Sequence, residues 1–200
     1  MVPNEGPAGG WQAAHPLISA AADPVARVVV APLLLVYRLR LVSYRTMSQA
    51  LSLVPGPGGI VLRRAWYSAT LASCGKGLRV LFGAVIHNPK ARVGDHCSIG
   101  ELNRVGLAEI GSNFMSSHNV CIVSGRHGHG MERSAVPIRS QPFTPARVTI
   151  GDDVWVGAGA TIGADVASHS VVGMGAVITA TFPEWSILAG VPGRVIGERS

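Results

Sequence analysis

A six-residue period runs through the C-terminal part of this 200-residue chain and constrains its fold more than any other feature. From about residue 78, an aliphatic residue recurs every six positions and is often followed by glycine, as in IGDDVWVGAGATIGADVA over residues 150–167. Neither the 3.6-residue period of a helix nor the strict alternation of a half-buried strand fits this pattern. The aliphatic positions are Val80, Ile86, Val93, Ile99, Val105, Ile110, Ile150, Val156, Ile162, Val172 and Ile178.

A period of six indicates one short strand and one tight corner, repeated along the chain. The aliphatic residue of each repeat is expected to point inward and to stack on its counterpart in the next coil, and the adjacent glycine allows close backbone approach at the corner. Each coil then buries its inner face only against its neighbours. The sequence therefore predicts an all-β solenoid, a parallel β-helix over residues 76–200. The interval from Ile162 to Val172 is ten residues, two fewer than two full repeats, so the sequence predicts one shortened coil.

The N-terminal part has a different composition. Residues 1–24 are rich in Gly, Pro and Ala and are expected to form a flexible arm, without the basic start and apolar run of a signal peptide. Residues 25–45 are the most apolar stretch, but their uncharged part, 28–37, has about half the length that a spanning helix needs. A basic amphipathic helix fits better, lying either in a membrane interface or against the domain or a partner subunit.

The basic charge of the chain is concentrated in this same region. Between Pro24 and Gly94 there are ten Lys and Arg residues and no Asp or Glu, within a net charge of +6. A Pro-Gly break at 53–59 precedes an expected helix over 60–75, whose arginines stand beside Trp66 and Tyr67, a combination that suits a lipid interface or the edge of a core. Because the arginines alternate with aliphatic runs, they do not predict a nucleic-acid site. Residues 25–75 are thus one basic amphipathic helical segment with a possible peripheral membrane contact.

An excursion over residues 126–147 interrupts the repeats, and a long loop on a rigid scaffold is where function usually resides. His127 and His129 lie in its first turn, SGRHGHG, and His118 lies just before it. A neutral imidazole accepts a proton near neutral pH, so these histidines are candidate general bases. A partner that orients the ring is left open between Asn119, Glu132 and a backbone carbonyl. Cys121 is expected to face the interior of its coil.

The C-terminal segment carries a resemblance to a known family. The motifs VWVGAGA, GMGAVIT and AGVPGRVI, in this order within residues 154–196, resemble the hexapeptide-repeat acyltransferases, in particular the maltose-, galactoside- and polysaccharide-type O-acetyltransferases. The resemblance implies that the β-helix is left-handed and parallel, and the N-terminal amphipathic helical segment inferred above precedes it. The resemblance also implies a homotrimer with one site in each groove between subunits.

The same resemblance implies a reaction and its residues. The expected function is an O-acetyltransferase that moves an acetyl group from acetyl-CoA to a sugar hydroxyl of a surface polysaccharide or glycolipid, without a metal. His127 is the expected base and His129 the second choice. The glycine-rich corner is expected to meet the thioester, the next coil to extend the groove, and the final segment to meet the nucleotide. These cofactor positions are Trp155, Gly157, Ala158, Gly159, Ala176, Thr179, Pro192 and Arg194.

Several alternatives remain open at this point. The amine of an amino sugar is an alternative acceptor, and a β-helix that serves as a scaffold or adaptor without catalysis is an alternative function. A zinc lyase similar to the γ-type carbonic anhydrases needs three histidines on successive coils, and the C-terminal motifs favour the transferases. The expected location is the cytoplasm, at the inner face of the membrane if the N-terminal segment binds lipid.

Overall fold

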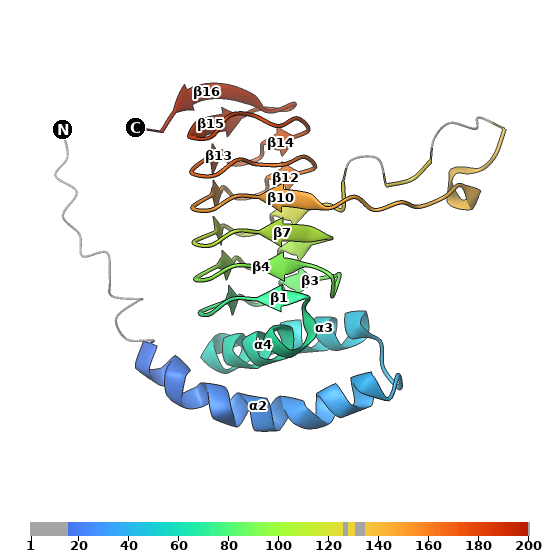
Figure 1. Cartoon of the computed structure of the whole chain (residues 1–200), viewed down its shortest axis with the longest axis vertical. Coiled ribbons are helices and arrows are strands. Elements are labelled where there is room, and N and C mark those ends of the chain that lie inside the picture. Colours follow the sequence, from blue (N-terminus) through green and yellow to red (C-terminus); the bar gives the residue numbers. More distant parts are fainter. Residues whose placement is uncertain (1–15, 126–127, 131–134, 200) are drawn as a thin grey trace.

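The computed structural model describes residues 16–125, 128–130 and 135–199. A tall solenoid stands on a layer of helices, and one long loop leaves its side at mid-height (Figure 1). The helical layer precedes the solenoid in the chain and forms its base. Its helices are α2 (Pro16–Arg38), α3 (Tyr44–Ser52) and α4 (Gly56–Thr70).

The solenoid has three parallel sheets, which the chain visits in turn, so that strands one coil apart pair in register. Sheet A contains β1 (Ser73–Cys74), β4 (Arg92–Val93), β7 (Ala108–Ile110) and β10 (Val148–Ile150). Sheet B contains β2 (Arg79–Val80), β5 (Ser98–Ile99), β8 (Met115–Ser116), β11 (Trp155–Val156), β13 (Val171–Val172), β15 (Ser186–Ala189) and the antiparallel β16 (Arg194–Glu198). Sheet C contains β3 (Val85–Ile86), β6 (Arg104–Val105), β9 (Cys121–Ile122), β12 (Thr161–Ile162) and β14 (Val177–Ile178).

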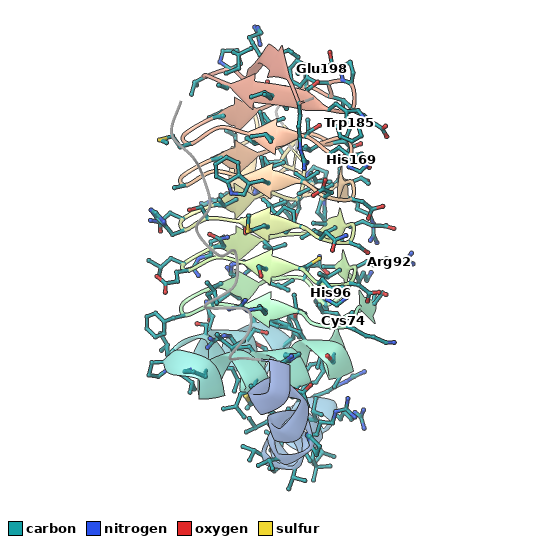
Figure 2. All side chains as sticks on the ribbon, turned by 90° about the vertical axis from the view of Figure 1, so that its left-hand side faces the viewer. Cys74, Arg92, His96, His169, Trp185 and Glu198 are labelled. Atoms are coloured by element: carbon teal, nitrogen blue, oxygen red, sulfur yellow. The ribbon has the colours of Figure 1, made fainter. Side chains whose placement is uncertain are left out.

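The predicted aliphatic positions form the core of the solenoid, because the second residue of nearly every short strand is buried. The position after the buried residue is often glycine because the next coil packs too closely to leave room for a side chain. A Cβ on Gly157, for example, would lie 2.6 Å from the backbone nitrogen of Met174 in the next coil. Positive φ angles occur further along the corner, and residues other than glycine adopt many of them. Figure 2 shows three such residues, His96, His169 and Trp185, along the edge between sheets A and B.

The shortened coil after Ile162 has a visible consequence. Val166 stands where a sheet A strand is expected and forms an isolated bridge to Ile150. The chain then passes directly to β13 in sheet B, so sheet A ends at β10, below the last strand of sheet C, β14, and the last strands of sheet B, β15 and β16.

The helical layer corrects two sequence-based expectations and decides between two alternatives that the sequence left open. Helix α2 begins at Pro16, inside the predicted arm 1–24, because proline is well tolerated in a first turn and Ala-rich sequence follows. Helix α4 begins at Gly56, inside the predicted break, with Pro57 in its first turn. Trp66, Tyr67 and Arg63 are fully buried, so the lipid-interface interpretation of this helix is wrong.

Candidate functional site

The excursion leaves the solenoid between β9 and β10 through a two-stranded stalk. The amide of Gly130 donates to the carbonyl of Pro142 at 2.9 Å, and the amide of Thr144 donates to the carbonyl of Gly128 at 2.7 Å. Between these bonds, His129 forms an antiparallel bridge with Phe143, and the two rings pack with centroids 4.7 Å apart. The backbone thus holds His129 at the base of the loop.

The root of the stalk is closely packed. Gly125 has a φ of +78°, and a Cβ on it would lie 2.7 Å from the Cβ of Ala146. The amide of Ala146 donates to the carbonyl of Ser124 at 2.9 Å. A left-handed conformation favours glycine and this close approach excludes a side chain, so Gly125 fixes where the two legs of the excursion meet the solenoid.

A hollow of about 490 Å³ lies on one side of this root, and we call it the lower hollow. The stalk contributes His129 and Phe143, and the outer surface of sheet C contributes His87, Arg104 and Cys121. The described lining residues include no carboxylate. The hollow is therefore apolar in its walls and positive in its charged groups.

His87 and Arg104 give the lower hollow its electrostatic character. Burial lowers the pKa of His87, and the nearby charges of Arg45 and Arg104 lower it further. Its Nδ1 is buried without a hydrogen-bond partner among the described residues. Arg104 donates from one guanidinium nitrogen to the carbonyl of Gly83 at 2.9 Å. His87 is thus a neutral imidazole held beside a cation.

The orientation of Cys121 differs from the predicted one. Its side chain faces the lower hollow, not the coil interior, because Ile122 is the buried residue of β9. Burial raises the pKa of the Cys121 thiol, and Arg104 opposes this rise. The group is therefore a thiol near neutral pH and is poorly suited to act as a nucleophile.

A second hollow of about 380 Å³, the upper hollow, lies on the other side of the root. Gly125 borders both hollows. Arg147 and Ala146 line the upper hollow from the returning leg, and Asp165 and Thr179 line it from the coils above. Thr179, predicted to contact the cofactor, is therefore placed beside the excursion.

The other predicted cofactor residues lie elsewhere on the solenoid. Trp155 is exposed on sheet B, and Gly157, Ala158 and Gly159 form the corner between sheets B and C. Ala176 is fully buried, and its amide and carbonyl are both hydrogen-bonded, so it offers no surface to a ligand in this structure. Pro192 and Arg194 are exposed in the final hairpin.

The histidines predicted as candidate bases also do not lie together in the described structure. His127 and Glu132 lie outside the described residues. His118 is exposed at the corner between sheets B and C, where its carbonyl accepts a hydrogen bond from the amide of Gly159. Sheet C separates His118 from the lower hollow, so among the described candidates only His129 belongs to that hollow.

The described residues that line the lower hollow include three that sequence reasoning did not select: His87, Arg104 and Phe143. A signal for Arg104 was available in the sequence. Arg104 pairs with Val85 below and Cys121 above, so one-coil intervals of 19 and 17 residues place their outward side chains on one surface. Phe143 has no repeat register, and only the folded stalk reveals its position.

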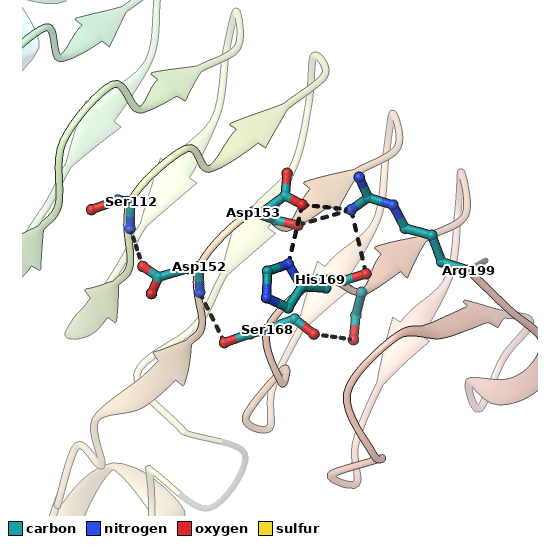
Figure 3. Close-up of polar contacts among 7 residues, drawn as sticks. Ser112, Asp152, Asp153, Ser168, His169 and Arg199 are labelled. Atoms are coloured by element: carbon teal, nitrogen blue, oxygen red, sulfur yellow. Dashed lines mark hydrogen bonds and ion pairs between the residues drawn. The ribbon is translucent and has the colours of Figure 1, made fainter.

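A polar cluster occupies a different edge, between sheets A and B (Figure 3). Asp153 accepts from Arg199 at 2.8 Å and contacts His169 Nδ1 at 3.2 Å. The hydrogen bond from His169 is the main reason that the pKa of Asp153 is lowered. The His169 ring stacks on Trp185, with centroids 4.2 Å apart. This cluster fastens the C-terminal end of the chain to the solenoid.

Two features are absent from the described residues. They contain no group of three or more His, Cys, Asp or Glu side chains placed to hold a metal ion. None of the helices within the described ranges combines the length and the apolar character needed to cross a membrane.

Comparisons with known proteins agree with the repeats and the fold. Residues 147–180 match the family model described as the hexapeptide repeat of succinyl-transferase. A relative from Escherichia coli K12, named as the lipopolysaccharide biosynthesis O-acetyl transferase WbbJ, is 29% identical over 123 residues, which cover 57% of this chain and 60% of the relative. The chain spans between 39% and 60% of the length of the curated relatives it matches.

Solved structures show the same architecture. A maltose O-acetyltransferase from Clostridium difficile 630 superposes with a TM-score of 0.67 at 25% identity and covers 78% of this chain and 85% of its own. A hexapeptide-repeat acetyltransferase from Vibrio cholerae, complexed with acetyl coenzyme A, gives a TM-score of 0.62 at 19% identity, with coverages of 78% and 87%. The predicted hexapeptide repeats and the predicted fold class, a left-handed parallel β-helix behind a helical segment, are confirmed.

Proposed function

We propose that this hexapeptide-repeat β-helix protein, which shares its repeats and fold with sugar O-acetyltransferases, transfers an acetyl group from acetyl-CoA to a sugar hydroxyl. The observation that carries the proposal is the stalk of the excursion. It holds an imidazole, His129, over a hollow large enough for a sugar ring, in a fold that a solved relative uses with acetyl coenzyme A.

The chemistry needs one base near the acceptor. A sugar hydroxyl has a pKa far above neutral, so an imidazole must take its proton as the oxygen attacks the thioester carbonyl. A carbon–oxygen bond forms, the carbon–sulfur bond then breaks, and the imidazolium returns the proton to the departing thiolate. We assign the base to His127 or His129, which are two residues apart in the sequence. Backbone amides of the glycine-rich corners would stabilise the oxyanion.

The donor side of the site fits a thioester arm in part. Gly159 lies at an open corner, since a Cβ on it would meet no atom within 4 Å, and Trp155 provides an exposed ring on the neighbouring strand. Arg194 offers an exposed guanidinium, which suits a phosphate group. Acetyl-CoA would bring the activated acetyl group, and these residues would bind and orient it.

The proposed donor-binding residues and the candidate base lie on different sides of sheet C, and this arrangement supports a homotrimer. Trp155 and the Gly157–Gly159 corner lie across sheet C from the excursion and its two hollows. One chain therefore does not bring donor corner and candidate base together. A neighbouring subunit that presents its corner to the excursion would complete the site, and a surface polysaccharide or glycolipid is the proposed acceptor.

Alanine substitution of the two histidines tests the assignment. The true base should lose about 10²- to 10⁴-fold in kcat, measured as thiol release from acetyl-CoA with a panel of neutral, acidic and amino sugars. His96→Asn is the matched control, because His96 is exposed on the edge between sheets A and B, away from both hollows and from the Gly157–Gly159 corner, and it should retain activity. Light scattering should show an unchanged oligomer in all variants.

The outcomes separate the candidates. Full activity of His127→Ala would move the base to His129, and full activity of both variants would refute the mechanism. Transfer to amino sugars alone would identify an N-acetyltransferase. No thiol release with any acceptor, together with no acetyl-CoA binding in calorimetry, would favour the scaffold.

A further inference from the structure

Helix α2 is apolar on two opposite faces, and only one of them is covered. Ala26 and Val30 are buried, and Leu33, Leu34 and Tyr37 pack half-buried against the core of the helical layer. This inner face meets α4, which makes the more extensive contact with α2. The inner face alone accounts for the amphipathic pattern that packing requires.

The outer face is a continuous apolar stripe that the described residues leave uncovered. It carries five aliphatic side chains between 51% and 73% exposed, and Leu41 in the following turn is 71% exposed. Helix α2 forms the lowest layer of the molecule, and its side chains project away from the solenoid at the base (Figures 1 and 2). A stripe of this size on the end of a molecule marks an interaction surface. Its members are Val25, Val28, Val29 and Leu35 of the helix and Leu39 directly after its end.

Cations border this stripe. Arg27 and Arg38 are exposed and, eleven residues apart, share one flank of the helix, and Arg40 and Arg45 are exposed just beyond it. No Asp or Glu occurs between Pro24 and Gly94, and the ion pair formed at this end joins Arg64 to Asp23. The rim of the stripe is therefore positive.

The positive rim allows a choice between two binding partners for the stripe, a second copy of the chain and an anionic lipid surface. A second copy docked face to face would bring arginines against arginines, with no carboxylate in the segment to separate them. An anionic lipid surface supplies the missing negative charge and an apolar layer beneath it. The observations favour lipid.

Pro32 indicates how deep the helix would lie. Proline has no amide hydrogen, so the carbonyl of Val28, one turn earlier, loses its helical hydrogen bond. Both residues are exposed on the outer face. A carbonyl without a partner is tolerated where water reaches it, as in the headgroup region, and is costly in hydrocarbon.

We propose that the outer stripe of α2 binds the surface of an anionic membrane, with the helix in the plane of the headgroups and the solenoid standing away from the bilayer. The arginines at its rim contact lipid phosphates, and the valines and leucines enter the upper acyl region. The surface is confined to α2 and the turn after it, since the aromatic residues and Arg63 of α4 are buried and Arg64 forms an ion pair with Asp23. The proposal does not depend on acetyl transfer.

Vesicle sedimentation of the full chain tests this surface. Wild-type protein should bind vesicles of phosphatidylcholine with phosphatidylglycerol more strongly than phosphatidylcholine alone. The double variant Val28→Glu/Leu35→Glu should lower the ratio of bound to free protein about tenfold or more, because two charges enter the apolar layer. The matched control is Met174→Glu/Ile196→Glu, two exposed apolar residues at the opposite end of the solenoid, which should bind as wild type.

A second pair of substitutions tests the charge. Arg27→Gln/Arg38→Gln should weaken binding to the anionic vesicles severalfold and leave binding to neutral vesicles unchanged. Thermal unfolding should be unaltered in every variant, since all of the changed side chains are exposed. Absence of wild-type binding, or equal binding by the glutamate variant, would overturn the proposal. A self-associated species that forms without lipid and disappears in Val28→Glu/Leu35→Glu would show that a second copy occupies the stripe.

Discussion

The solenoid and the helical layer build their cores from different materials. The solenoid repeats one small aliphatic residue per strand, so each coil contributes a similar increment of burial. The helical layer relies on single large side chains, of which Trp66, Tyr67 and Arg63 are fully buried. A repeating core tolerates the loss of one element better than a core that depends on a few residues.

The contact between the two regions shows why the helices are needed. The lowest coil has backbone groups that would pair with a further coil. The Arg63 guanidinium donates to the carbonyl of Val80 at 2.7 Å, and the hydroxyl of Tyr67 accepts from the amide of Ile86 at 3.1 Å. The carbonyl of Ser52 accepts from the amide of Gly83 at 2.8 Å. The helical layer therefore caps the open end of the solenoid, which would otherwise bury unpaired polar groups.

The largest expected loss of stability comes from removing a buried side chain from the helical layer that caps the solenoid. Trp66→Ala removes a fully buried indole and its 2.9 Å hydrogen bond to Ser48, and it should lower the free energy of unfolding by about 3–5 kcal/mol in urea titration. Trp155→Ala removes an indole that is 42% exposed on the solenoid and should cost less than about 1 kcal/mol. Equal losses would contradict the distinction between the two regions.

A smaller change in stability, of opposite sign in the two regions, is expected when one glycine in each is replaced by alanine. Gly175 has a φ of +67°, and a Cβ added there would meet no neighbouring atom within 4 Å, so Gly175→Ala tests backbone strain alone and should destabilise the protein by about 1 kcal/mol. Gly58 also has open space but lies in α4 without a positive φ, so Gly58→Ala should stabilise it by about 0.5 kcal/mol. Effects of the same sign in both variants would remove the role of corner conformation.

The smallest expected effect lies where the two regions meet. His87 has a lowered pKa from burial, from Arg45 on α3 and from Arg104 on β6, while His129 and Cys121 face the same hollow. Below about pH 6.5 the unfolded chain binds a proton at His87 more readily than the folded chain, so stability should fall as the pH falls. Urea midpoints between pH 7 and pH 5 should show this slope, and His87→Gln should flatten it. An unchanged slope would mean that His87 is not the responsible group.

The repeat pattern predicted the coil cores, the place of the excursion in the chain and the shortened coil, because each is a local property of spacing. It misplaced Cys121, since one residue of register decides which side of a two-residue strand faces inward. It left Trp66 and its neighbours open between a lipid interface and the edge of a core, because a Trp-Arg cluster has the same sequence signature in both. The lower hollow is lined by three coils and a stalk, and the repeat register relates the coils to one another but carries no information about the stalk.

The amino-acid sequence by itself determined the solenoid, because inward aliphatic residues every six positions can be buried only by stacking coils. The tertiary structure decided that the stalk brings His129 to the surface of His87 and Arg104, and that Trp155 and its neighbouring corner lie across sheet C from the stalk. It also decided which face of α2 stays uncovered. Both depend on packing between segments distant in the chain, and the period of the repeats carries no information about that packing.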